Sequence, residues 1–475
     1  MNKIKINHYK LSFLALFSIT SILMFLLTLN AYPSNKWVYI FFSIISFILL
    51  FYSFNKFSFF FEKFFSVYLW LGFWFKFSII IILSKDNNYK FTEGVSVIDV
   101  EKYFDKSLVI SAYFFIFLLV LIFFRVKLFE LFREYLENKH KNEFLFKTQK
   151  IENIIFFIFI IFCILISILN FYYQIFQKGT ISSKNISFMI ALIIKWFFLI
   201  GFPAIISIFL FNKIKNLKSN FFTPILISLT LIFTYNVSLL SRAIIFDFMS
   251  ILYGVYIQAN KKIFLEKKKF FFIFSFSCLL FASSIVIIND IRLDRNIIQS
   301  EIKSDIKEKM IFHSNEFRVL IVNRFVGIDS LLNISQSQNL SLSLFIDSLN
   351  NKIKNNDKGF YERKFLKINT KVNEQHKKNS NIIVPGIIAY LYYTGSILLV
   401  LLFFLPIYIL IIFIEFITLK FSNNNLILAS VIGNILAYRL IHFGYMPQNT
   451  YQLIIGVMLA IFIYPTIKRI FSARI

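Results

Sequence analysis

Three arginines in this sequence stand where a permanent positive charge is costly. Arg242 interrupts the apolar stretch "VSLLSRAIIFDF", and Arg439 lies in "AYRLIHFGYMPQN", near the end of another apolar run. Arg324 falls in the middle of an apolar stripe when "EFRVLIVNRFVGIDSLLNI" is drawn as a helix that turns about 100° per residue. A guanidinium group donates two parallel hydrogen bonds to phosphate oxygens. Arginines gathered in one place would therefore hold a diphosphate and stabilise the charge that grows on it as a leaving group.

Two further side chains could exchange protons beside these arginines. His442 follows Arg439 by three residues, so both lie on one helical face, and an imidazole can act as a base near neutral pH. Asp329 could orient an arginine or accept a proton. Each candidate also has a plainer interpretation. Arg324 could be a snorkelling residue of a surface helix, Arg242 an interfacial anchor, the histidine a structural residue and the aspartate one half of an ordinary salt bridge.

Other side chains are candidates for contacts to the same ligand. Arg318 and Asp329 lie together on a helical flank, about 100° round from Arg324. Lys195, in "IALIIKWFFLIGF", could bind phosphate from within the helix bundle. Arg292 follows an apolar run directly, and it either contacts the ligand or only ends its helix. The predicted ligand contacts are Arg318, Arg292, Lys195, Tyr445 and Tyr392.

The sequence lacks the motifs of several other reactions. It has no phosphate-binding loop of the Walker type, no HExxH and no cluster of histidines and cysteines, so neither ATP hydrolysis nor a zinc site is indicated. Cys163 and Cys278 lie in separate apolar runs, which argues against a disulfide framework. Acidic residues are scattered, without the paired aspartates of a metal-dependent sugar-nucleotide transferase. A reaction that needs no metal and no cofactor fits this inventory best.

The elements that must position these residues are membrane-spanning helices. Of 475 residues 58% are hydrophobic and only 16% are charged, against about 25% charged in soluble domains. Apolar runs of roughly 17 to 25 residues recur, long enough to cross a hydrocarbon core of about 30 Å. The sequence therefore predicts an all-α polytopic membrane protein. Basic cytoplasmic loops and contact with anionic lipid explain the formal charge of +26, and no nucleic-acid partner is predicted.

Loop charges predict the topology of the chain. Loops 125–150, 212–220 and 260–269 are densely basic and should be cytoplasmic. No small-residue cleavage site follows the first apolar run, which we interpret as an uncleaved span. Twelve spans put both termini on the same side of the membrane, and the basic loops predict that this side is the cytoplasm. The predicted spans are 11–29, 37–54, 64–84, 107–125, 152–171, 187–211, 221–240, 243–258, 270–288, 386–414, 425–443 and 451–467.

This topology divides the chain into three parts. Residues 1–288 form nine transmembrane helices, 289–385 an extracytoplasmic loop domain, and 386–475 three further transmembrane helices. In the large loop we expect amphipathic helices that lie at the bilayer surface. One is expected over 317–334 and another over 340–353.

Three stretches resemble bacterial O-antigen and capsule repeat-unit polymerases of the Wzy type, relatives of the O-antigen ligases. They are "LSRAIIFDFM" at a tight outer hairpin, "NRFVGIDSLLNI" in the large loop and "VPGIIAYLYYTGSILLVLLFF" at the return to the membrane. The resemblance covers most of residues 230–445. It implies a GT-C-like membrane glycosyltransferase at the outer face of the bacterial inner membrane. Such an enzyme transfers a growing glycan from undecaprenyl diphosphate to an incoming lipid-linked repeat unit.

For the residues of this chain, the resemblance implies that Arg242, Arg324 and Arg439 hold the departing diphosphate. His442 or Asp329 would then be the base. The implied partners are the undecaprenyl-diphosphate-linked glycan as donor and acceptor, membrane lipids and a chain-length regulator protein. Two alternatives remain: an O-antigen ligase, and a flippase or other transporter of lipid-linked oligosaccharide. The lack of a visible internal duplication argues against a transporter.

Overall fold

Within the part of the chain that the computed structural model describes, the protein is helical and contains no strand. The description covers residues 8–55, 57–83, 101–137, 149–178, 187–216, 222–241, 243–259, 267–298, 325–350, 359–366, 384–444, 447 and 450–473. Helices form because a chain in hydrocarbon must satisfy its backbone hydrogen bonds internally.

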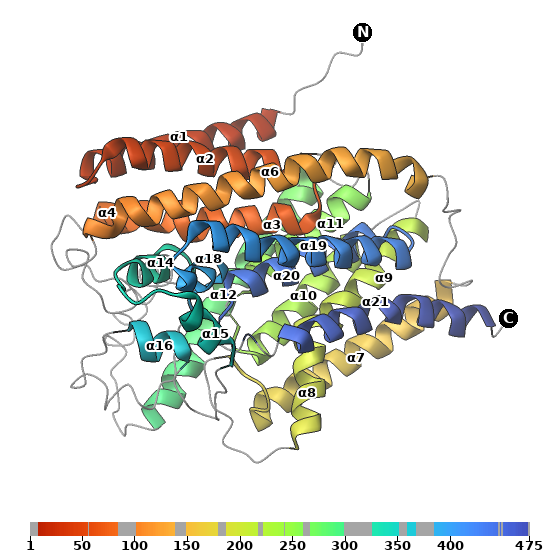
Figure 1. Ribbon diagram of the computed structural model, residues 1–475. Helices are drawn as coiled ribbons and strands as arrows, with labels where there is room; N and C mark the ends of the chain where they lie inside the picture. The colour runs from red at the N-terminus through yellow and green to blue at the C-terminus, as the bar shows by residue number, and fades with distance from the viewer. Residues whose placement is uncertain are drawn as a thin grey trace, which may run out of the picture.

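The helices fall into long ones that build a bundle and short ones that gather at one of its ends (Figure 1). The helices of the first half are α1 (His8–Ala31), α2 (Lys36–Ser53), α3 (Phe60–Leu69), the π-helical η1 (Trp70–Phe75), α4 (Lys76–Leu83), η3 (Glu101–Tyr103), α6 (Phe104–Glu137), α7 (Gln149–Tyr173), α8 (Phe188–Trp196), the π-helical η4 (Phe197–Gly201) and α9 (Phe202–Asn216). Those of the second half are α10 (Phe222–Ser238), α11 (Ile244–Gln258), α12 (Lys267–Ile298), α14 (Ile328–Ser335), α15 (Leu342–Asn350), α16 (Phe360–Phe365), α18 (Ile387–Leu391), η6 (Tyr392–Thr394), α19 (Ile397–Phe421), α20 (Leu426–Ile441) and α21 (Thr450–Ala473). We call the end that carries α14, α15, α16 and α18 the α14 end.

Seven helical segments in the described residues are long and apolar enough to cross a membrane. They are Lys36–Ser53, Phe60–Leu83, Glu101–Lys127, Ile151–Tyr173, Met189–Ile214, Phe271–Arg292 and Ile397–Phe421. Shorter apolar helices are Ala15–Ala31, Phe222–Ser238, Ile244–Gln258, Leu426–Ile441 and Thr450–Ile463. The chain is thus a polytopic helical membrane protein, as its composition predicts.

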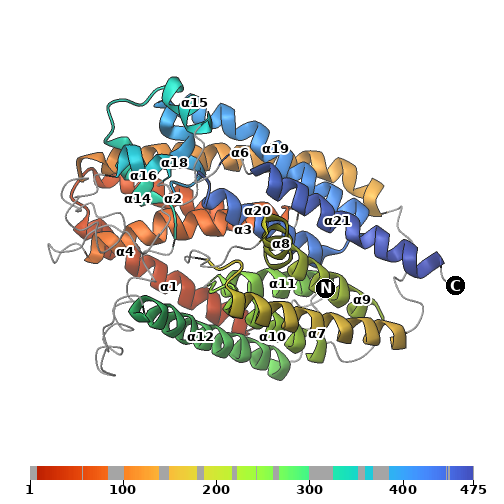
Figure 2. The same cartoon turned by 90° about the horizontal axis from the view of Figure 1, so that it is seen from below.

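Helix α20 lies at the centre of the bundle, between α3 and α11 (Figure 2). Its start is capped by Asn425, whose side chain accepts hydrogen bonds from the backbone of Ile427 and Leu428 at 3.1 and 3.0 Å. Two glycines allow close packing. A Cβ on Gly254 of α11 would lie 2.7 Å from Cα of Ile427, and one on Gly433 of α20 would lie 2.6 Å from the backbone nitrogen of Phe61. The far end of α20, which carries Arg439, is therefore held firmly in place.

A buried polar network fixes α3 at the end of the bundle opposite to the α14 end. Arg125 of α6 forms an ion pair with Glu62, and the hydroxyl of Tyr408 donates to the same carboxylate at 2.5 Å. Glu415 of α19 accepts hydrogen bonds from the first backbone N–H groups of α3, at 2.7 Å from Phe60 and 2.9 Å from Phe61. These bonds satisfy backbone donors at a helix end whose first residues, Phe60 and Phe61, are buried.

The helix expected over 317–334 is confirmed only in part: within the described residues, 328–334 are helical and 325–327 are not. Residues 325–327 are bent, and helix α14 begins only after Gly327. All eight residues of α14 are buried, and the helix packs against α6 and α18, so it has no exposed polar face of the kind expected for an amphipathic surface helix. The bend at 325–327 interrupts the helical register directly before Ile328. The helix expected over 340–353 is present as α15.

Two boundaries also differ from the predicted spans. The helix α19 begins at Ile397, not at 386, because Gly395 ends the preceding turn with a left-handed φ of +73°. The intervening residues form the short α18 and η6. Helix α12 continues to Ile298, beyond the predicted boundary at 288.

Two glycines far apart in the sequence bring the 325–327 turn against η1. A Cβ on Gly72 would lie 2.3 Å from the carbonyl oxygen of Val326, and one on Gly327 would lie 2.3 Å from that of Gly72. We expect Gly72→Ala to destabilise the protein by about 1–3 kcal/mol or more, since backbone atoms cannot move aside. Thermal unfolding in detergent micelles measures the effect.

Gly201→Ala is the matched control for this substitution, because Gly201 also belongs to a π-helical segment. There a new Cβ would meet mainly the Trp196 side chain, at 2.9 Å, and a side chain can adjust. A smaller loss of stability is expected than for Gly72→Ala. Equal melting temperatures for the two variants would contradict the close backbone approach.

Candidate functional site

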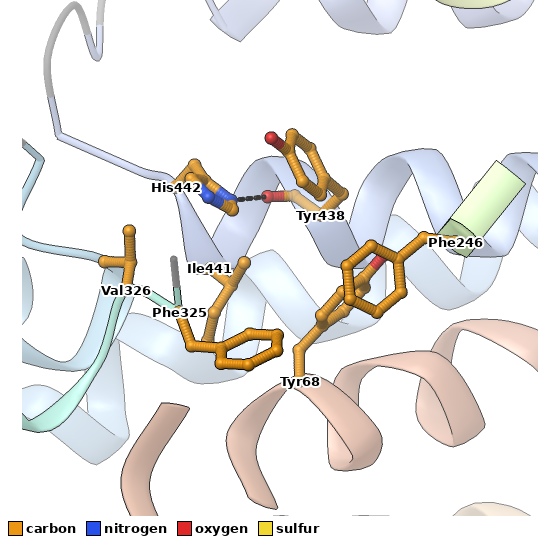
Figure 3. A pocket seen from close by; sticks show the side chains of 7 residues that line it. All are labelled: Tyr68, Phe246, Phe325, Val326, Tyr438, Ile441 and His442. Atoms are coloured by element: carbon orange, nitrogen blue, oxygen red, sulfur yellow. Dashed lines mark hydrogen bonds between the residues drawn. The ribbon is translucent and has the colours of Figure 1, made fainter. Parts of the chain in front are cut away.

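Three segments that the sequence singles out meet at one small pocket toward the α14 end (Figure 3). The pocket holds about 30 Å³, room for one or two water molecules. Its lining is mostly aromatic and comes from α3, α11, the 325–327 turn and the end of α20. The lining residues are Tyr68, Phe246, Phe325, Val326, Tyr438, Ile441 and His442. We call it the aromatic pocket.

Tyr68 holds the floor of the aromatic pocket together. Its hydroxyl donates a hydrogen bond of 2.7 Å to the side-chain oxygen of Asn434 on α20. Its ring centroid lies 4.7 Å from that of Phe246 and 6.0 Å from that of Tyr438. Phe246 in turn meets Phe325 edge to face at 6.4 Å. Aromatic contacts of this kind add to area burial, so the three segments are packed as one unit.

His442 ends α20 at the rim of the pocket. Its ring stacks on Tyr438 with centroids 4.1 Å apart, and Nδ1 lies 3.0 Å from the backbone oxygen of Tyr438 (Figure 3). A carbonyl oxygen only accepts hydrogen bonds, so in this contact Nδ1 carries the proton. The basic lone pair of the neutral imidazole is then on Nε2.

Lys76 of α4 clamps the turn that leads into α14. Its Nζ donates to the backbone oxygen of Phe325 at 2.8 Å and forms an ion pair of 2.5 Å with Asp329. Both side chains are at least 97% buried. Asp329 therefore takes the salt-bridged role that the sequence left open, with a lysine that sequence reasoning did not single out.

Four basic side chains from four parts of the chain lie beside the aromatic pocket. We call Lys178, Lys195, Arg292 and Arg439 the basic cluster. Lys178 lies 5.3 Å above the ring of Tyr438, and its Nζ is 3.1 Å from the hydroxyl of Ser241. One guanidinium nitrogen of Arg292, Nη2, donates to the backbone oxygens of Lys178 and Leu240, at 2.9 and 2.8 Å.

The basic cluster includes two cations that repel each other. Lys195 lies close enough to Arg439 for their charges to interact, and its Nζ sits 5.8 Å above the ring of Phe176. Nε of Arg439 is buried and has no hydrogen-bond partner in the described part of the chain. Near the cluster, the carboxylate of Asp247 interacts with the charge of Lys178. The same carboxylate accepts a hydrogen bond of 2.9 Å from the side-chain nitrogen of Asn236. The arrangement has more positive charge than this one carboxylate balances, which favours binding of an anion.

Two predicted ligand contacts are placed differently from the sequence interpretation. Lys195 is exposed on the side of the short α8 and is not enclosed within the bundle. Tyr392 is 4% exposed in η6 and does not line the aromatic pocket. Burial raises the pKa of Tyr392, and its hydroxyl stays protonated at neutral pH.

Four other predicted residues lie outside the described residues: Arg242, Arg318, Arg324 and Tyr445. Their neighbours in the chain are nevertheless informative. Phe325, which follows Arg324, lines the aromatic pocket, and Ser241, which precedes Arg242, contacts Lys178.

Comparison with protein-family models, with curated proteins and with solved structures gave no match.

Proposed function

We propose that this protein is a metal-independent membrane glycosyltransferase that polymerises undecaprenyl-diphosphate-linked oligosaccharide repeat units at the outer face of the bacterial inner membrane. One observation carries the proposal. The segments around Phe246, Phe325 and His442 meet at one pocket, beside a basic cluster whose Arg439 has an unpaired buried donor. A diphosphate beneath a glycan is an anion that such a cluster would bind.

The proposed reaction needs no metal. A hydroxyl oxygen of the acceptor sugar forms a bond to the anomeric carbon of the donor, and the bond from that carbon to the diphosphate oxygen breaks. The hydroxyl proton passes to Nε2 of His442. Arg439 and Lys195 stabilise the charge that grows on the departing diphosphate more than they stabilise the bound substrate, which is what accelerates the step.

Arg242 and Arg324 complete the proposed set through their neighbours in the chain. Consecutive Cα atoms are about 3.8 Å apart, and the proposal rests on the two arginines being neighbours in the chain of Ser241 and Phe325. Asp329, in contrast, supports the turn through Lys76, and we assign the proton transfer to His442.

The reaction requires the α14 end to face the outside of the cell. We propose twelve spans with both termini in the cytoplasm, from the seven long apolar helices, the five shorter ones and the basic loops. The partners would be the lipid-linked glycan, as donor and acceptor, and a regulator of chain length.

The test is a deletion strain, with its surface polysaccharide separated by gel electrophoresis. Loss of the ladder of long chains, with the acceptor carrying a single repeat unit retained, is the expected result. Return of the ladder on expression of the wild-type chain is the control. Loss of every capped acceptor would overturn the proposal in favour of a ligase or a flippase.

A further inference from the structure

A wide groove opens between α1 and α2, away from the aromatic pocket. It encloses about 800 Å³, within the range of about 300–1,000 Å³ for sites that bind small molecules. Apart from three serines and a tyrosine the lining is hydrocarbon. The lining residues are Phe17, Ser18, Ser21, Ile22, Phe25, Ser43, Ile44, Phe47, Ile48, Phe51 and Tyr52.

Contacts within the protein hold the residues that line this groove in place without a bound ligand. Trp74 of η1 donates a hydrogen bond of 2.9 Å to the hydroxyl of Ser43, and its ring lies 4.7 Å from that of Phe47. Trp70 contacts both sides of the groove, with its ring 5.6 Å from Phe17 and 6.0 Å from Phe47. The π-helical turn thus fixes the aromatic residues on both walls of the groove.

The position of the groove indicates which medium fills it. Both walls are apolar helices whose outward residues, such as Ile22, Ile44 and Ile48, are exposed on the surface of the bundle. Along α1 the lining runs from residue 17 to 25, and along α2 from 43 to 52. At 1.5 Å per residue each stretch is about 12–14 Å long, close to half of a hydrocarbon core of about 30 Å.

The lined part of α2 ends beside Ser53, at the end of the bundle opposite to the α14 end. The groove therefore lies in a single leaflet, the one farther from the basic cluster.

We infer that this groove binds one fatty-acyl chain of a phospholipid from the leaflet opposite to the basic cluster. If the groove were empty, the residues that line it would lose dispersion contacts on that side. Water does not fill it, because an apolar groove offers water few hydrogen-bond partners. The lined stretch is about half as long as the hydrocarbon core is thick, which matches the reach of one acyl chain within one leaflet. A helix of a partner that crossed the membrane would need a groove along the whole thickness of the core. This site is separate from the proposed transfer reaction and does not depend on it.

Photolabelling tests the inference. The purified protein is placed in vesicles of phosphatidylethanolamine and phosphatidylglycerol, with a trace of phosphatidylethanolamine that carries a diazirine on one acyl chain. After illumination, the labelled residues are mapped by mass spectrometry. The expected result is label concentrated on groove residues such as Ile22, Ile44 and Ile48. Label spread evenly over the exposed faces of α1 and α2 would overturn the inference. Absence of label from the groove residues, as expected if a second copy of the protein covers them, would overturn it as well.

Two variants of α1 sharpen this test. Ser18 is exposed and lines the groove, so the ring of Ser18→Phe would fill it. Label on Ile44 and Ile48 should then fall at least about tenfold, equivalent to about 1.4 kcal/mol. Thr20→Phe is the matched control, because Thr20 is exposed on α1 but does not line the groove. Unchanged labelling of Ile44 and Ile48 in the Ser18→Phe variant contradicts the inference. If that variant does not fold, the distribution of label in the wild-type protein alone tests the inference.

Discussion

Replacement of Arg439 by alanine should lower the rate of glycan polymerisation by about 10²–10³-fold, the usual cost of one lost donor to a developing negative charge. The side chain lies at the end of the central helix, near Lys195, and its Nε is buried without a hydrogen-bond partner in the described residues. Arg439→Lys keeps the charge but loses the planar fork, and activity between those of the alanine variant and the wild type is expected. The measurement is polymer formation by membrane vesicles supplied with lipid-linked repeat units.

The melting temperature of the Arg439→Ala variant distinguishes a role of Arg439 in ligand binding from a role in folding. Alanine at this position removes one of two cations that repel each other, so the melting temperature should stay the same or rise. Arg363→Ala is the control, since Arg363 is an exposed arginine on α16, and its polymer should be of normal length and amount. A fully active Arg439→Ala variant would remove this residue from the proposed site.

The second large effect is expected at the ion pair between Lys76 and Asp329. Lys76→Met removes the cation that forms an ion pair with Asp329, in a site where both side chains are at least 97% buried. Breaking a buried pair on one side costs about 3–5 kcal/mol, a large fraction of the stability of most proteins. We expect the variant to unfold in detergent at a clearly lower temperature and to accumulate poorly in membranes. Lys76→Met combined with Asp329→Leu should recover much of the loss, because no charge is then left alone.

Lys106→Met provides the matched control for this pair. Lys106 also donates to the α14 segment, to the backbone oxygen of Ser335 at 3.2 Å, but it is exposed. Its loss should change stability by about 0.5–1.5 kcal/mol, the usual value for one hydrogen bond. Equal destabilisation by the two single substitutions would show that the buried charge is not what matters.

The transmembrane helices could be predicted from the sequence because a membrane restricts the structures that an apolar segment can adopt. A run of about 20 apolar residues has few alternatives to a helix in hydrocarbon, and the stretches that became α2, α6 and α19 could be identified from length alone. The turn at 325–327 could not. It exists because Gly327 contacts Gly72, and a contact between residues so far apart leaves no periodic signal in either stretch. The local pattern around Arg324 therefore favoured one continuous helix.

The site was predictable to a similar degree. The sequence singled out Arg439 and His442, and their helix does end beside Phe325 and Phe246. Lys76 was missed, although a lone lysine within "LGFWFKFSIII" breaks the same rule against charge in an apolar span. Lys178 carried no such signal, because it follows an apolar run in a loop where lysine is ordinary. Only packing brings it over Tyr438.

The contact between Lys76 and Asp329 constrains the order of biogenesis. The helix that carries the lysine leaves the ribosome about 250 residues before its aspartate. At about 5–20 residues per second this delay is roughly 10–50 s. During that time the newly inserted hairpin contains a cation with no counter-ion, and Gly72 has no partner turn. The first third of the bundle can therefore settle into its mature packing only after a distant segment has been synthesised and has reached the same side of the membrane.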